Sequence, residues 1–228
     1  MYWTEEKETK DEFVIPENVI DVVFSVKGKS IPLDNAHALS FAIEQVLPWV
    51  VEDQRIGIHQ VFGAESGNGW QRPENTDNEI LHLSKRQKLT IRVPSERLED
   101  IQALNGQILN IDDYELTVGK SIVRKLSDMN IVFARHVVHS ESSQTEDEFM
   151  QSCADQLNEL GIQIKKMMCG RERYIQLPDK KLITRGLMIA DLEKADSVRL
   201  QEQGIGVGRR LGCGLFLPQK GIDAVNPD

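Results

Sequence analysis

One order of strands and helices, β-α-β-β-α-β, occurs twice in this chain and limits its possible folds more than any other feature. In the first half we expect strands at residues 19–26, 56–62, 80–83 and 88–93, helices at 35–47 and 95–104, and further strands at 109–118 and 122–126. In the second half we expect strands at residues 131–138, 162–168, 174–177, 182–190 and 213–217, with helices at 145–160 and 193–203. The repeated order predicts an α+β protein with two tandem ferredoxin-like domains.

The predicted boundary lies between residues 127 and 128. The first domain would then cover residues 1–127, including an acidic N-terminal tail, and the second would cover residues 128–228. The tail has no basic segment followed by an apolar one, and no apolar run reaches the roughly 20 residues that cross a bilayer. We therefore predict a cytoplasmic protein with no membrane partner.

Charge is distributed unevenly along the chain. The net charge of −9 argues against diffuse binding of nucleic acid. However, residues 1–160 hold 15 basic and 28 acidic residues, whereas residues 161–228 hold 12 basic and 8 acidic residues. This asymmetry is compatible with a local site for a polyanion in the second domain.

A glycine-rich segment lies between the last predicted helix and the last predicted strand. Its glycines are Gly204, Gly206, Gly208, Gly212 and Gly214, and the paired Arg209 and Arg210 interrupt them. Glycines let backbone amides approach an anion closely, and arginines add phosphate donors. Dinucleotide and Walker-type loops run from a strand into a helix, the opposite order, so both are disfavoured. A turn that only packs the helix against the strand stays an alternative.

This segment, at the end of a second ferredoxin-like domain, resembles the CRISPR-associated repeat-processing endoribonucleases of the RAMP superfamily. The likeness to the myxan-type branch extends to Gly57-Ile58-His59, Trp70-Gln71-Arg72-Pro73-Glu74, Met167-Met168-Cys169-Gly170-Arg171 and residues 212–221. It implies metal-independent cleavage of CRISPR precursor RNA at the base of a repeat stem-loop, which leaves a 2′,3′-cyclic phosphate. It also implies other subunits of a CRISPR effector complex as partners, and no cofactor.

His37 is the first candidate for catalysis. On a helical wheel it lies about 160° from the centre of the apolar face of its helix, so it should not be a core residue. Its imidazole could accept the proton of a ribose 2′-OH, or its conjugate acid could protonate the leaving 5′-oxygen. The resemblance implies a catalytic histidine at or just before this helix, but in the myxan-type branch it more often stands where Asn35 is, with an aromatic residue at position 37. Either His37 has taken over the role, or this protein cleaves poorly.

The other histidines are weaker candidates. His59 lies in a predicted strand and ranks second for catalysis, and His82 should lie on an edge strand. His136 and His139 should point to opposite faces of a strand and so cannot share a metal ion. The three cysteines are too widely spaced for a zinc site. We therefore predict no metal site.

Basic residues of the second domain would bind the RNA. The predicted RNA-binding residues are Arg171, Arg173, Lys180, Lys181, Gly206, Gly208, Arg209, Arg210 and Gly212. Lys180 and Lys181 at a hairpin tip would enter the groove of a stem, while the arginines would contact phosphates. Lys29 and Tyr174 are weaker candidates for stabilising the phosphorane.

Two other functions stay open from the sequence. One is an RNA-binding subunit that caps the repeat hairpin with little cleavage, which the Asn35 departure favours. The other is a ferredoxin-like regulatory protein that binds a small anionic metabolite. Loss of RNA binding, with stabilisation by such a ligand, would identify the latter.

Overall fold

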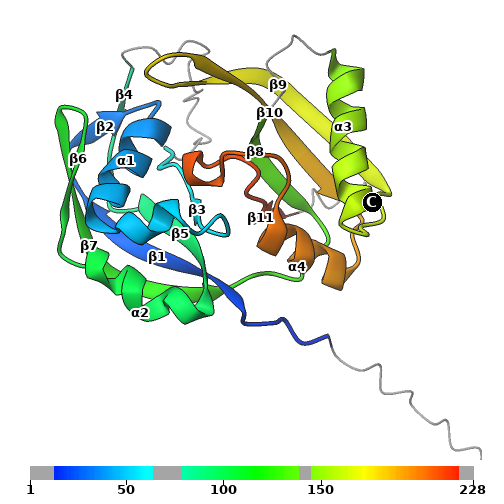
Figure 1. The fold of residues 1–228 in the computed structure, drawn as a ribbon, viewed down its shortest axis with the longest axis horizontal. Coiled ribbons are helices and arrows are strands. Elements are labelled where there is room, and N and C mark those ends of the chain that lie inside the picture. Colours follow the sequence, from blue (N-terminus) through cyan, green and yellow to red (C-terminus); the bar gives the residue numbers. More distant parts are fainter. Residues whose placement is uncertain (1–12, 64–78, 139–144, 221–228) are drawn as a thin grey trace, which may run out of the picture.

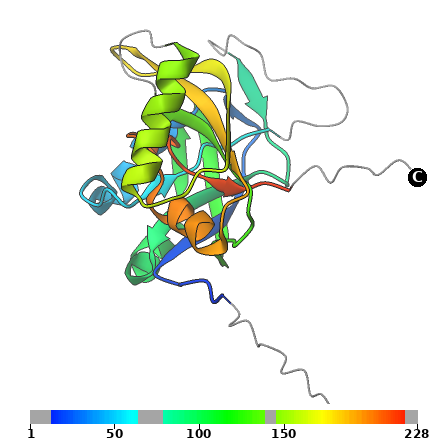
Figure 2. The same cartoon turned by 90° about the vertical axis from the view of Figure 1, so that its right-hand side faces the viewer.

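A computed structural model describes residues 13–63, 79–138 and 145–220. It contains two α/β units side by side, each a β-sheet with helices packed on one face (Figure 1). In the view turned by 90°, α3 lies in front, on the side away from the first unit, and α4 lies below it (Figure 2).

The first unit is a five-stranded antiparallel sheet. Its order is β3 (Gly57–Ile58), β5 (Lys88–Pro94), β1 (Val19–Lys27), β7 (Tyr114–Lys125) and β6 (Ile108–Ile111). The helices are α1 (Ala36–Val46) and the short α2 (Leu98–Ile101), and a 3-10 turn (Pro48–Val51) follows α1. Alternate residues of β1, such as Val22 and Phe24, pack against Leu39 and Ile43 of α1 to form the core.

The second unit has the expected order without insertions. Its strands are β8 (Val132–Val138), β9 (Lys166–Gln176), β10 (Lys181–Ala190) and β11 (Leu217–Pro218), and its helices are α3 (Glu146–Glu159) and α4 (Lys194–Gln203). The sheet order is β11-β8-β10-β9, so the unit's first strand, β8, lies between its third strand, β10, and its fourth, β11. In the same way, β1 lies between β5 and β7 in the first unit. The prediction of tandem ferredoxin-like folds is confirmed. The spacing of Thr145 and Glu148 in the sequence is that of a capping box, and this box forms at the start of α3.

Several strand boundaries differ from the prediction. The expected strand at residues 109–118 is interrupted by a turn at Asp112, which has a φ of 51° and separates β6 from β7. Strands expected at residues 162–168 and 174–177 form one strand, β9, because β10 supplies hydrogen-bonding partners through the intervening residues. The strand expected at residues 56–62 shortens to β3. An unpredicted strand, β2 (Ser30–Pro32), pairs with β4 (Ile80–His82).

A buried arginine joins the two units. Arg92 of β5 donates two hydrogen bonds to the carboxylate of Asp21, at 2.8 and 2.9 Å, and two more to the carbonyl oxygens of Gln201 and Phe216 in the second unit. Its side chain is fully buried. A charged group is stable in such a place only when it is paired and hydrogen-bonded, as Arg92 is. The two units therefore share a fixed contact.

The segment between the two sheets is also held in place. The amide of Gln201 donates to the carbonyl oxygen of Ser127 at 2.5 Å, and Ser197 Oγ donates to the carbonyl oxygen of Met129 at 2.5 Å. The proposed division at residues 127 and 128 lies in this segment, after β7 and before β8. In the described part of the chain, no helix is long and apolar enough to span a membrane.

Candidate active site

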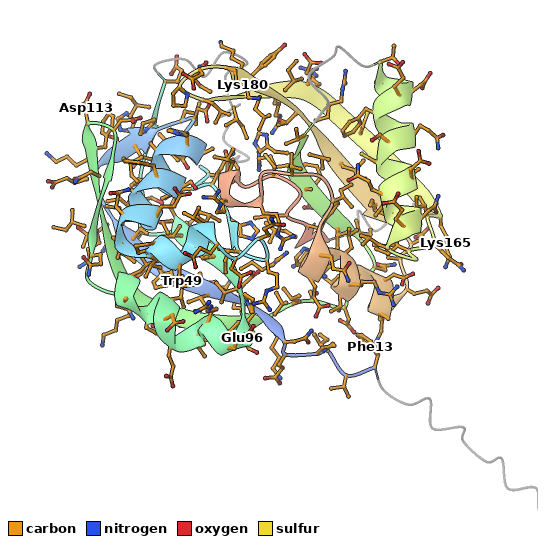
Figure 3. All side chains as sticks on the ribbon, viewed as in Figure 1. Phe13, Trp49, Glu96, Asp113, Lys165 and Lys180 are labelled. Atoms are coloured by element: carbon orange, nitrogen blue, oxygen red, sulfur yellow. The ribbon has the colours of Figure 1, made fainter. Side chains whose placement is uncertain are left out.

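A cavity of about 810 Å³ opens where the two units meet. Three segments form most of its wall: α1 of the first unit, residues 206–211 of the glycine-rich segment, and residues 177–180 in the turn between β9 and β10. Figure 1 shows the glycine-rich segment, in orange and red, lying between α1 and the second sheet. Figure 3 shows Lys180 on the upper edge of the molecule, at the β9–β10 turn. Both units thus contribute to one site.

One face of α1 supplies four polar or aromatic side chains to this cavity. His37, Ser40, Phe41 and Glu44 follow one another at helical spacing, opposite the face that carries Leu39. His37 is partly exposed, in the first turn of the helix, so the expectation that it lies outside the core is confirmed. Its ring lies nearly parallel to that of Phe41, with an interplanar angle of 11° and centroids 6.5 Å apart.

Asn35 has a structural role. It is the N-cap residue of α1, but its side chain makes no capping hydrogen bond. Its amide instead donates to the carbonyl oxygen of Val61 at 2.9 Å and accepts from the backbone N–H of Val61 at 3.0 Å. The side chain is fully buried. Position 35 therefore ties α1 to the segment after β3 and does not face the cavity.

The glycine-rich segment divides into packing and surface positions. A Cβ on Gly204 or Gly214 would clash with the backbone of the same segment, and one on Gly212 would lie 3.1 Å from Gln60 Cγ. Gly206 and Gly208 line the cavity, and a Cβ on Gly206 would have no neighbour closer than 3.8 Å. All five have positive φ, which favours glycine. The expected packing turn thus describes Gly204, Gly212 and Gly214, whereas Gly206 and Gly208 lie on the cavity wall.

The two adjacent arginines have different surroundings. Arg209 donates to the carbonyl oxygens of Gln203 at 2.5 Å, Glu202 at 3.0 Å and Arg55 at 3.2 Å. Burial lowers the pKa of Arg209 to about 10, and the nearby Arg92 charge adds to this. Its guanidinium therefore supports the fold, and its role as a phosphate ligand stays a prediction.

Arg210 faces the cavity. Its guanidinium forms an ion pair with Glu44 of α1, and the same Glu44 oxygen accepts a hydrogen bond from Ser40 Oγ at 3.0 Å. Both charged side chains keep some exposure, at 36% for Arg210 and 21% for Glu44. Arg209 also lines the cavity, but its guanidinium donates to backbone carbonyls, so Arg210, which pairs with a side chain, is the better placed of the two to bind an incoming anion.

The other described histidines, His59, His82 and His136, do not line the cavity. His59, directly after β3, is buried, and burial lowers its pKa to about 4, with Arg92 acting in the same direction. His82 is exposed at the end of β4, as predicted for an edge strand. His136 is buried and its Nδ1 lies 2.8 Å from Thr184 Oγ1. His139 lies outside the described residues, as do residues 70–74 of the resemblance.

The structure brings together part of the predicted site. His37, Lys180, Gly206, Gly208, Arg209 and Arg210 line the cavity, whereas Arg171, Arg173, Lys181 and Gly212 do not. Arg171 and Arg173 lie along β9, and Lys181 begins β10. Of the weaker candidates, Tyr174 donates to Glu172 at 2.7 Å and Lys29 is exposed; neither lines the cavity.

Three cavity residues on α1 were not predicted from the sequence. Ser40, Phe41 and Glu44 stand three, four and seven positions after His37, so the helical wheel that singled out His37 also contained them. Within the described ranges, no three His, Cys, Asp or Glu side chains gather as metal ligands.

Comparisons with known proteins agree with this architecture. The model of a protein family described as Cas6 Crispr matches residues 20–221. The CRISPR-associated endonuclease Cas6 of Myxococcus xanthus (strain DK1622) is 31% identical over 199 residues, which cover 87% of this chain and 81% of the relative.

Two solved structures share the fold. A CRISPR associated protein Cas6 matches with a TM-score of 0.63 at 12% identity, over 89% of this chain and 100% of the other. A structure described as an RAMP protein binding different RNA substrates matches with a TM-score of 0.60 at 11% identity, over 88% and 100%.

Proposed function

Because this chain belongs to the Cas6 family of CRISPR-associated proteins, we propose that it is an endoribonuclease that binds repeat stem-loops in CRISPR precursor RNA and cleaves them to guide RNA. One observation carries the proposal: a cavity between the two ferredoxin-like units combines His37 with Arg210, Lys180 and the open glycines Gly206 and Gly208. A proton-transfer group thus lies beside cations and unhindered backbone, as cleavage of a phosphodiester requires.

The proposed reaction needs no metal ion. The ribose 2′-OH attacks the adjacent phosphorus, the bond from phosphorus to the 5′-oxygen breaks, and the products are a 2′,3′-cyclic phosphate and a 5′-OH. One proton leaves the 2′-OH and one reaches the departing 5′-oxygen, and His37 performs one of these transfers. Arg210 and the backbone beside Gly208 stabilise the charge that develops on the phosphorane oxygens, while the N–H of Gly206 donates to Gln156 Oε1 at 2.8 Å and holds the segment in place.

The stem of the repeat would bind to the second unit. Lys180 and Lys181 stand at the turn between β9 and β10, and Arg171 and Arg173 lie along β9. RNA helices are recognised largely through their shape and backbone, which suits such a row of cations. Gly212 and Arg209 would contribute by holding the glycine-rich segment in place. Other subunits of a CRISPR effector complex are the further partners that we propose.

A hairpin-capping subunit with little cleavage is the second candidate. Two observations favour it: Asn35 is locked in the buried position where the family often has histidine, and Glu44 neutralises Arg210 in the absence of RNA. Cleavage and binding must therefore be measured separately.

Replacement of His37 tests the proposed chemistry. We expect His37→Ala to lower the single-turnover rate of repeat cleavage in EDTA by about 10²- to 10⁴-fold, the usual effect of one proton-transfer group. Hairpin affinity should change little, because an imidazole makes few phosphate contacts. His82→Ala, an exposed histidine outside the cavity, is the matched control and should cleave normally. Normal cleavage by His37→Ala would refute the assignment, and binding without cleavage by the wild type would support the capping subunit.

A further inference from the structure

We propose that the cavity binds an unpaired nucleobase next to the scissile phosphate, stacked on the ring of Phe41. This inference rests on the proposed function and adds a feature of the substrate, an unstacked nucleotide at the cleavage site.

Exposed apolar side chains gather in this cavity from three separate segments. Phe41 of α1 is 55% exposed, Val51 after α1 is 49% exposed, and Val207 of the glycine-rich segment is 67% exposed. All three line the same cavity. Apolar side chains brought together on a concave surface are typical of a binding site.

The cations of the same cavity define what the apolar surface binds. Arg210 and Lys180 line it with the three apolar residues. A ligand must therefore present both an anionic group and a flat or apolar one. A nucleotide has this combination, since one ribose joins its base to its phosphate. The volume of about 810 Å³ lies within the range of pockets that hold molecules of this size.

The position of Phe41 relative to His37 places the base beside the reaction. The two rings are nearly parallel, at 11°, and stand one helical turn apart on α1. A base stacked on Phe41 would therefore lie parallel to the imidazole and hold the attached ribose close to it. Both faces of a base are covered inside a duplex, so only an unpaired base or the last pair of the stem could stack there, and a cavity lined by apolar residues of three segments suits the single unpaired base. Stacking on an aromatic ring accepts any base, because every base has a π-face.

A double-mutant cycle tests this inference. Repeat RNAs that carry a single abasic nucleotide, at each position flanking the cleavage site in turn, are cleaved by the wild type and by Phe41→Ala. We expect Phe41→Ala to slow cleavage about 10- to 100-fold, as for loss of one base–aromatic stack. An abasic nucleotide at one position should cause the same loss, and the two changes together should cause no further loss. Phe41→Trp should retain the wild-type rate within a few fold.

Fluorescence gives an independent measurement of the stack. With 2-aminopurine at the position found by the cycle, binding to the wild type should change the fluorescence, and binding to Phe41→Ala should not. Ile108→Ala is the matched control, because Ile108 is 56% exposed but lies on β6, outside the cavity. The inference would be overturned if the losses in cleavage rate from Phe41→Ala and from the abasic nucleotide were additive at every position. It would also be overturned if Phe41→Ala and the wild type gave the same fluorescence change. If the wild type binds the repeat without cutting it, the proposed cleavage fails, and 2-aminopurine placed at each flanking position in turn then decides whether the base site exists.

Discussion

At the residue scale, two neighbouring arginines differ in what they contact. Arg209 holds three backbone carbonyls, whereas Arg210 faces the cavity in an ion pair with Glu44. We expect Arg210→Ala to weaken repeat binding and to reduce the salt slope of the affinity by about one. Its cost in stability should be about 1 kcal/mol or less, since the pair is partly exposed.

Arg209→Ala should show the reverse pattern. Removal of its guanidinium leaves three carbonyl oxygens without their donor, which should lower the free energy of unfolding by about 1–3 kcal/mol. The salt slope of RNA binding should stay unchanged. Urea denaturation and affinity at several salt concentrations, measured on both variants, compare the two residues. Equal salt slopes for both would contradict their different roles.

The sequence could not distinguish these two arginines. They share the same neighbours and the same glycines, and only tertiary packing turns Arg209 toward residues 55, 202 and 203. His37 was identifiable because a helix fixes which side chains share a face, so local periodicity alone placed it away from the core. The structural role of Asn35 could not be identified in this way, because its hydrogen-bonding partner Val61 lies 26 positions away in the sequence.

At the element scale, the glycine-rich segment combines positions with different tolerance for a side chain. Gly206 and Gly214 both have positive φ, at 72° and 65°, so alanine costs about 1 kcal/mol at either from backbone conformation. At Gly214 the new Cβ would also clash with the carbonyl oxygen of Ile205, whereas at Gly206 it would make only ordinary contacts, the nearest with Val137 Cγ1 at 3.8 Å.

We expect these glycines to differ in thermal stability. Gly206→Ala should lower the Tm by about 2–4 °C, and Gly214→Ala should lower it at least about twice as much. Thermal unfolding followed by circular dichroism measures both. A larger loss for Gly206→Ala than for Gly214→Ala would show that the segment packs differently from this description.

Elements were predictable where local signals were strong. The capping box fixed the start of α3, and the apolar periodicity fixed α1. The interior of β9 was missed because Gly170 and the charged Arg171 favour a turn locally, while pairing with β10, where Gly186 lies close to Gly170, keeps it extended. Asp112 was a missed local signal, because Asp tolerates the left-handed conformation of a turn.

At the scale of the whole molecule, the cavity exists only because the two units are joined. The buried Arg92 and Asp21 pair links β5 and β1 to the second unit, and His59 is buried beside it. Burial opposes ionisation of Asp21, but the Arg92 charge outweighs this and holds the pKa of Asp21 below its usual value. No periodicity in the sequence indicates such a contact between residues 71 to 124 positions apart.

Low pH should lower the stability of the protein through His59, which is buried at the contact between the two units. Burial, followed by the Arg92 charge, lowers the pKa of His59 from 6.5 to about 4, so the folded protein keeps a neutral ring where the unfolded chain binds a proton. The unfolded state therefore gains protons first as the pH falls, and stability is lost between about pH 6.5 and pH 4, by about 3 kcal/mol at most. His59→Gln removes this titration but keeps a polar side chain. Urea denaturation from pH 7.5 to 4.5 should show the wild type losing more stability than His59→Gln, with the gap between the two proteins changing below pH 6.5. If the difference in free energy of unfolding between the two proteins stays constant with pH, His59 does not titrate on unfolding, and acid destabilises the protein through other groups.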